Sequence, residues 1–214
     1  MTKTIAAFFD EEAARHDEQF VHELGLSPFY DAVEQALNSC EKHSTVLVLG
    51  CGSGLEIERI RFACEVTGID LSEEMLNVLK RKQLSEGVKL TTVCASFLEW
   101  DLGMERYDIV LSCYALHHFN EEQKHQLYSR IHACLADGGV FINGDLFATD
   151  SHSEQEAMQQ ADEIYASQQL PFASLHVDVP FCWEHENAIL EQAGFSHIRL
   201  LKEWTNSKLY QCFK

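Results

Sequence analysis

The sequence predicts an α/β fold in which a mainly parallel sheet is covered by helices on both faces. Three observations support this prediction: short apolar runs alternate with amphipathic ones, most of these runs are rich in β-branched residues, and the chain closes with two runs separated by only three residues. Strands that are apolar on both sides are typical of a parallel sheet between helical layers. With 214 residues, 46% of them hydrophobic, the chain can bury one core of this kind.

Five runs in the first two thirds of the chain are strand candidates. They are TVLVLG at 45–50, CEVTGID at 64–70, KLTTVCA at 89–95, YDIVLSCYA at 107–115 and GVFINGDLF at 139–147. The clearest helix between them covers 120–136, where Asn120 can cap the start, Gln123 can reach back to it and Gly138 can end it. Repeated strand-helix-strand units predict parallel pairing.

The last third of the chain predicts a helical insertion, a further helix and a hairpin. Residues 150–170 are polar and helical in composition, and a second helix is expected at about 183–193. The runs 197–204 and 208–214 are separated only by Thr-Asn-Ser, and so short a connection joins antiparallel strands. One strand is therefore expected to run against the rest of the sheet.

The composition argues against several classes of function. The 34 acidic and 16 basic residues give a net charge of -18, which disfavours nucleic acid and anionic membranes as partners. The eight cysteines form no C-x-x-C pair, so we expect reduced thiols and a cytoplasmic location. No run approaches the roughly 18 apolar residues that span a bilayer, and we find no signal peptide.

Three of the 11 glycines follow the first predicted strand in the pattern G-x-G-x-G, at residues 50–54. A glycine turn lets a ligand touch the backbone, and a helix expected to begin near Leu55 would point free N–H groups at an anionic group. The spacing differs from the dinucleotide pattern G-x-G-x-x-G. At this point a purely structural turn remains an alternative.

An aspartate, Asp70, ends the second predicted strand, 20 residues after Gly50. In a doubly wound sheet this position faces a bound ribose. A carboxylate can accept strong hydrogen bonds from both ribose hydroxyls. The alternative is that Asp70 belongs to the start of the following helix, beside Ser72. The glycine turn and Asp70 together favour a nucleoside-containing ligand.

Five segments, taken in their order and spacing, resemble the class I S-adenosylmethionine-dependent methyltransferases of the small-molecule type. The segments are VLVLGCGSG, GIDLSEEML, YDIVLSCYALHHF, LADGGVFI and AGFSHIRL, and the resemblance covers roughly residues 45–214. It implies a doubly wound, Rossmann-like sheet of seven strands with the last strand antiparallel and helices on both faces. The hairpin derived above from the residues alone agrees with this expectation.

The resemblance implies which residues bind the cofactor, S-adenosyl-L-methionine. The implied contacts are Gly50, Cys51, Gly52 and Gly54 at the methionine part, Asp70 at the ribose, Leu71, Met75, Ser96 and Phe97 around the adenine, and Ser112 and Cys113 along the methionine chain. Two positions depart from the family pattern. Val48 stands where an acidic residue is common, and Ser96 stands where an aspartate is common. Each lost contact costs about 0.5 to 1.5 kcal/mol, so we expect weaker cofactor binding.

In these terms the whole chain, 1–214, forms a single methyltransferase domain with four parts. They are an N-terminal helical lid at 1–43, the cofactor-binding core at 44–149, a helical insertion over the active site at 150–182, and a closing helix and hairpin at 183–214. Aromatic residues gather in the two segments that are expected to form a roof over the active site: Phe8, Phe9, Phe29, Tyr30, Tyr165, Phe172, Phe181 and Trp183. They indicate a closed, partly apolar pocket of small-molecule size, although core packing is an equal alternative.

Methyl transfer from a sulfonium is an in-line displacement, so the protein mainly aligns the reacting groups. A base is needed only when the acceptor must lose a proton, and His117, just beyond the fourth strand, is the best-placed candidate. The alternative is a structural histidine at a strand-helix junction. The other histidines show no metal-ligand spacing, so no metal site is expected.

The sequence therefore predicts a methyltransferase that acts on a small-molecule acceptor. One alternative is an enzyme similar to the carboxy-S-adenosylmethionine synthases, which needs a cation for the added carboxylate, but Ile189 stands near the place of the expected arginine. A non-catalytic module that binds S-adenosylmethionine is the third hypothesis. The acceptor and the oligomeric state stay open.

Overall fold

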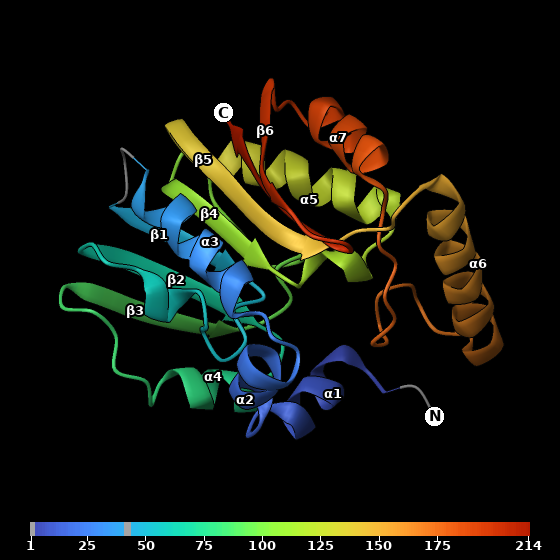
Figure 1. Cartoon of the computed structure of the whole chain (residues 1–214), viewed down its shortest axis with the longest axis horizontal. Coiled ribbons are helices and arrows are strands. Elements are labelled where there is room, and N and C mark those ends of the chain that lie inside the picture. The colour runs from blue at the N-terminus through green and yellow to red at the C-terminus, as the bar shows by residue number, and fades with distance from the viewer. Residues whose placement is uncertain (1–2, 41–43) are drawn as a thin grey trace.

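A computed structural model describes residues 3–40 and 44–214, and its centre is one seven-stranded sheet in the order β3-β2-β1-β4-β5-β7-β6 (Figure 1). The strands are β1 (Thr45–Leu49), β2 (Cys64–Asp70), β3 (Val88–Cys94), β4 (Tyr107–Cys113), β5 (Leu135–Leu146), β6 (His197–Glu203) and β7 (Ser207–Phe213). All seven strands predicted from the sequence are confirmed. β7 pairs antiparallel with both β5 and β6, while the pairs from β3 to β5 are parallel.

Helices lie on both faces of the sheet, with α3 on one face and α5 and α7 on the other (Figure 1). The α-helices are α1 (Ile5–Glu12), α2 (His16–Glu18), α3 (Ser27–Asn38), α4 (Glu73–Leu79), α5 (Glu121–Cys134), α6 (Ser151–Gln168) and α7 (Trp183–Gln192). Three helical turns of other types complete the elements: the π turn η1 (Gln19–Glu23) and the 3₁₀ turns η2 (Ile57–Arg59) and η3 (Leu116–His118). This arrangement confirms the predicted doubly wound sheet.

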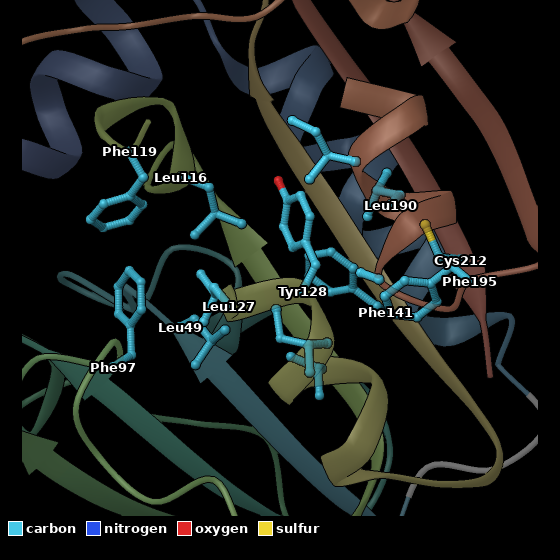
Figure 2. Packing of buried hydrophobic residues seen from close by; sticks show 14 of the residues in the cluster. Leu49, Phe97, Leu116, Phe119, Leu127, Tyr128, Phe141, Leu190, Phe195 and Cys212 are labelled. Atoms are coloured by element: carbon cyan, nitrogen blue, oxygen red, sulfur yellow. The ribbon is translucent and has the colours of Figure 1, made fainter. Parts of the chain in front are cut away.

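Strand β1 shows how the sequence divides the core into two layers. Its side chains alternate, so Val46 and Val48 pack in the cluster under α3, whereas Leu47 and Leu49 pack in the cluster under α5 and α7. All four side chains are fully buried, as expected for a central parallel strand. Figure 2 shows part of the second cluster, in which Phe97 and Phe119 meet edge to face with ring centroids 5.5 Å apart.

Helix α5 begins as the sequence predicts. The Asn120 side chain accepts a hydrogen bond from the N–H of Gln123 at 2.9 Å, and the Gln123 side chain accepts one from the N–H of Asn120 at 3.2 Å. Such a reciprocal pair satisfies two N–H groups that the helix leaves free. The far end differs from the prediction: α5 stops at Cys134 and runs straight into β5, and Gly138 lies inside the strand with φ +72°.

The prediction of an α-helix starting near Leu55 is wrong. The chain forms only the 3₁₀ turn η2 and reaches β2 at Cys64. Ile57 and Ile60 are both fully buried, and a 3₁₀ turn places residues three apart on the same side. The glycine turn therefore has no long helix dipole behind it.

None of the helices within the described residues combines the length and the apolar character needed to cross a bilayer.

Candidate active site

The glycine turn follows β1 and lies against the carboxyl end of β2. Gly50 and Gly52 have φ values of +66° and +46°, in the region that favours glycine. A Cβ on Gly50 would also lie 2.5 Å from Cβ of Ala115, so a side chain has no room there. The N–H of Cys51 donates to the carbonyl of Ile69 at 3.0 Å and holds the turn against β2.

The carboxylate of Asp70 closes this turn. One oxygen accepts a hydrogen bond from the N–H of Gly52 at 2.7 Å, and the other accepts one from the N–H of Ser72 at 2.8 Å. Burial raises the pKa of Asp70, and these backbone hydrogen bonds act in the opposite direction. A carboxylate has about four acceptor positions, so each oxygen can still accept a hydrogen bond from a hydroxyl group.

A first cavity lies between this turn, the ends of β2 and β4 and the N-terminal helices. Eight of the predicted cofactor-binding residues line it: Gly50, Cys51, Gly52, Asp70, Leu71, Met75, Phe97 and Cys113. Three others do not. Gly54 packs closely under Leu79 of α4, the hydroxyl of Ser112 donates to the carbonyl of Leu49 at 3.0 Å, and Ser96 lies in the turn after β3.

The N-terminal helices cover the cavity and are tied to the core by polar contacts. Nδ1 of His16 lies 3.0 Å from the hydroxyl of Ser53, and that hydroxyl also donates to Asp17. Nζ of Lys82 lies 2.5 Å from the carboxylate of Asp17, whose pKa these partners lower although burial raises it. The lid therefore closes onto the glycine turn and the end of α4.

A second cavity, of about 420 Å³, opens beside the first. The two share Phe9, His16, Phe20, Tyr114 and His118 in their linings, so a ligand in one lies next to a ligand in the other. The remaining walls include Phe8 and Glu12 of α1, His117 of η3, and two residues of the loop after α6, His176 and Asp178. No lysine or arginine occurs among the described residues that line either cavity.

His117 lies between two carboxylates at the wall of the second cavity. Its Nδ1 is 2.5 Å from Oδ1 of the buried Asp145, and its Nε2 is 3.4 Å from Oδ1 of Asp178. Burial lowers the pKa of His117, but the charge and hydrogen bond of Asp145, helped by Asp178, raise it to about 9. His117 therefore carries a proton at neutral pH and can donate a hydrogen bond rather than accept a proton.

His118 behaves in the opposite way. Burial and the neighbouring charge of His117 lower its pKa to about 3, so it is neutral, and its Nδ1 lies 3.0 Å from the carbonyl of Val177. The fold brings potential ligand atoms of His117, His118 and Asp178 within 4.8 Å of one another, which the sequence spacing did not reveal. The proton on His117 already supplies a positive charge between Asp145 and Asp178.

The raised pKa of His117 predicts a pH dependence of stability. A histidine that binds its proton more tightly in the folded state stabilises the protein fully below pH 6.5, its unfolded pKa, and this contribution disappears as the pH rises to about 9. Over this window the free energy of unfolding should fall by an amount of the order of 3 kcal/mol that the variant His117→Gln lacks. Urea unfolding of both proteins at pH 6, 7, 8 and 9 checks this. Parallel pH profiles would contradict it.

The structure also shows site residues that the sequence did not indicate. Glu56, two residues after the last glycine of the turn, lines the first cavity and is only 4% exposed. Its Oε1 has no hydrogen-bond partner among the described residues. The available signal was an acidic residue between Leu55 and Ile57, in a segment that is otherwise buried. Tyr114, which the sequence also did not indicate, contributes to both cavities.

The predicted aromatic roof is only partly present. Phe9 and Tyr30 line the first cavity, and Phe8 and Phe9 line the second. The other aromatic residues considered for it lie in the two hydrophobic clusters instead: Phe29, Tyr165, Phe172, Phe181 and Trp183. The insertion contributes through the loop after α6, which supplies His176 and Asp178, and not through α6 itself.

Comparison with known proteins agrees with this geometry. A family model described as a methyltransferase domain matches residues 46–139. A carboxy-S-adenosyl-L-methionine synthase from Nautilia profundicola is 23% identical over 98% of this chain and 92% of its own. An uncharacterized methyltransferase from Bacillus cytotoxicus is 27% identical over 75% of this chain and 70% of its own.

Two solved structures show the same fold. One, described as a DhpI–SAH complex, has a TM-score of 0.72 and 18% identity over 97% of this chain and 93% of that chain. The other, human N-acetylserotonin methyltransferase in complex with SAM, has a TM-score of 0.62 and 14% identity over 88% of this chain and 52% of that chain.

Proposed function

Because the chain belongs to the class I S-adenosylmethionine-dependent methyltransferases, we propose that it transfers a methyl group from S-adenosyl-L-methionine to a small molecule. The observation that carries this proposal is the shared wall of the two cavities. One cavity offers a carboxylate for a ribose and a glycine-rich turn beside it, and the other offers room for an acceptor next to that ligand. This arrangement places two reactants side by side.

The residues of the first cavity fit S-adenosylmethionine. Gly50 and Gly52 leave the backbone bare, and Asp70 keeps acceptor positions for the two ribose hydroxyls. Met75 and Phe97 supply apolar walls for the adenine. When bound there, the cofactor supplies a methyl group on a positively charged sulfur, which is already an activated leaving group.

The residues of the second cavity would orient the acceptor and exclude water. Phe8, Phe9 and Phe20 give it an apolar wall, and His117 presents a proton on Nε2 beside Asp178. A protonated His117 does not act as a base at neutral pH. We therefore assign it to positioning, in which Nε2–H donates a hydrogen bond to the acceptor while Asp145 holds the ring through Nδ1.

Labelled S-adenosylmethionine and a panel of small amine, hydroxyl, thiol and carboxylate acceptors test this proposal. We expect transfer to at least one acceptor, with a rate that falls about tenfold or more in His117→Gln, through loss of the positioning hydrogen bond. The control is His152→Gln, because His152 is exposed on α6 and lines neither cavity. Tight binding without transfer to any acceptor would favour the non-catalytic module.

A carboxy-S-adenosylmethionine synthase is the second candidate, favoured by relatives of that name that align with almost the whole chain. Two observations count against it. No described lysine or arginine lines either cavity to hold an added carboxylate, and Ile189, near the place of the expected arginine, is buried in the hydrophobic core. Mass spectrometry of the cofactor released from purified protein decides: a cofactor heavier by one carboxyl group would establish the synthase.

We further propose that the protein works in the cytoplasm. All eight cysteines are free thiols, and six of them are buried: Cys51, Cys64, Cys113, Cys134, Cys182 and Cys212. A reducing compartment preserves such thiols.

A further inference from the structure

Glu56 is a buried carboxyl group whose bonding is incomplete. It lines the first cavity, its Oε1 accepts no hydrogen bond from the described residues, and no ion pair joins it to a described cationic side chain. A buried polar atom without a partner costs free energy unless a ligand or water supplies the missing contact. The buried position of the Glu56 carboxyl group therefore suggests that a ligand supplies the missing contact.

The two cationic side chains whose charges act on Glu56, Lys82 and Arg59, bind other groups. Lys82 binds the carboxylates of Asp17 and Glu58, at 2.5 and 2.6 Å. The guanidinium of Arg59 donates to the carbonyl of Leu55 at 2.5 Å and lies over the ring of Tyr30. Burial raises the pKa of Glu56 to about 8, and a hydrogen bond from its own backbone and the charges of Lys82 and Arg59 offset only part of that effect. A cation brought into the cavity would find this carboxyl group available.

The neighbours of Glu56 place it at the turn and at the end of β4. Its charge acts on the side chains of Cys51, Cys113 and Tyr30, all of which line the first cavity with it. Asp70, by contrast, is followed by Leu71 and Met75, the apolar part of the lining. With the ribose at Asp70 and the adenine against Leu71 and Met75, the glycine turn and Glu56 would be left to contact the amino-acid half of the cofactor.

We propose that Glu56 binds the α-ammonium group of the methionine half of S-adenosylmethionine. This inference rests on the proposed cofactor site. It also explains how the chain can have Val48, a fully buried residue of β1, at a position where an acidic residue is common in the methyltransferase family. The carboxylate is supplied instead from beyond the glycine turn, by the residue that follows Leu55.

Calorimetry with two ligands tests the assignment. S-adenosylhomocysteine carries the ammonium group, whereas 5′-methylthioadenosine has the same adenine, ribose and sulfur but lacks the amino-acid end. We expect Glu56→Gln to weaken S-adenosylhomocysteine binding about 10- to 100-fold and to change methylthioadenosine binding by less than about twofold. The control is Glu65→Gln, which removes an exposed carboxylate of β2 that lies 3.7 Å from Nζ of Lys89.

Proton release by the unmodified protein gives a second measurement that needs no variant. Because the pKa of Glu56 is about 8, the group is mostly protonated at pH 7, and an ammonium beside it should displace that proton. Titration in phosphate and in Tris buffer should show release of nearly one proton with S-adenosylhomocysteine and none with methylthioadenosine. The release should fade above pH 8.

The outcomes separate this inference from the proposed function. Equal effects of Glu56→Gln on both ligands, or no effect on either, would overturn the role of Glu56. Equal proton release with both ligands would overturn it as well, even if the variant fails to fold. If neither ligand binds the unmodified protein, the cofactor site itself is wrong.

Discussion

Replacing Asp145 with asparagine is expected to lower the free energy of unfolding by about 3 to 5 kcal/mol, because it removes one partner of a buried ion pair. Asp145 is 2% exposed, and its carboxylate accepts hydrogen bonds from Nδ1 of His117 at 2.5 Å and from the N–H of Leu116 at 2.9 Å. The asparagine keeps the shape but leaves the charge of His117 without its buried partner. Urea unfolding at pH 7, followed by circular dichroism, measures the loss.

The matched control is Asp178→Asn, which removes the other carboxylate beside His117. Its side chain is 49% exposed, so water can replace the lost contact, and we expect a change below about 1 kcal/mol. The pair of variants separates burial from charge. An equal, small effect of both substitutions would show that the pair with Asp145 does not stabilise the fold.

Replacing Asp70 with alanine is expected to weaken S-adenosylhomocysteine binding about 10- to 150-fold, equivalent to about 1.5 to 3 kcal/mol for hydrogen bonds to a charged group. The substitution removes the carboxylate expected at the ribose. It also leaves the N–H of Gly52 without its acceptor, so the glycine turn loses one of its hydrogen bonds to β2 and keeps the one from Cys51 to Ile69. Titration calorimetry with S-adenosylhomocysteine measures the change.

Glu73→Ala provides the comparison for this variant. Glu73 is an exposed acidic residue in the first turn of α4, three positions from Asp70, and it lines neither cavity. We expect less than about a threefold change in affinity, because an exposed charge is screened by solvent. An Asp70→Ala affinity within the range of this control would show that the ribose does not contact Asp70.

The sheet could be predicted because its signal is local. A run such as TVLVLG is apolar on both of its faces, which indicates a buried strand. The three-residue link before β7 permits only an antiparallel return. The start of α5 was likewise visible in Asn120 and Gln123. The short 3₁₀ turn after the glycine turn could not be predicted, because the spacing of Ile57 and Ile60 fits a 3₁₀ turn as well as an α-helix.

Contacts between distant segments could not be predicted in the same way. Lys124 looks like a solvent-facing residue of an amphipathic helix, yet its Nζ lies 2.7 Å from the buried carboxylate of Glu186 on α7. His117 meets Asp145 and Asp178, which stand 28 and 61 positions later in the chain. The periodicity of the sequence does not indicate contacts between such distant residues. The effect of the two carboxylates on the charge of His117 can therefore be seen only in the folded chain.

The proposed placement of the cofactor between the two cavities can be tested by a crystal structure of the protein with S-adenosylhomocysteine. We expect the ribose hydroxyls at Asp70, the amino group at Glu56, and the sulfur facing the second cavity that His117 and Phe8 line. This placement would put a transferred methyl group next to an acceptor. Ligand density outside the first cavity, or a sulfur turned away from the second, would contradict it.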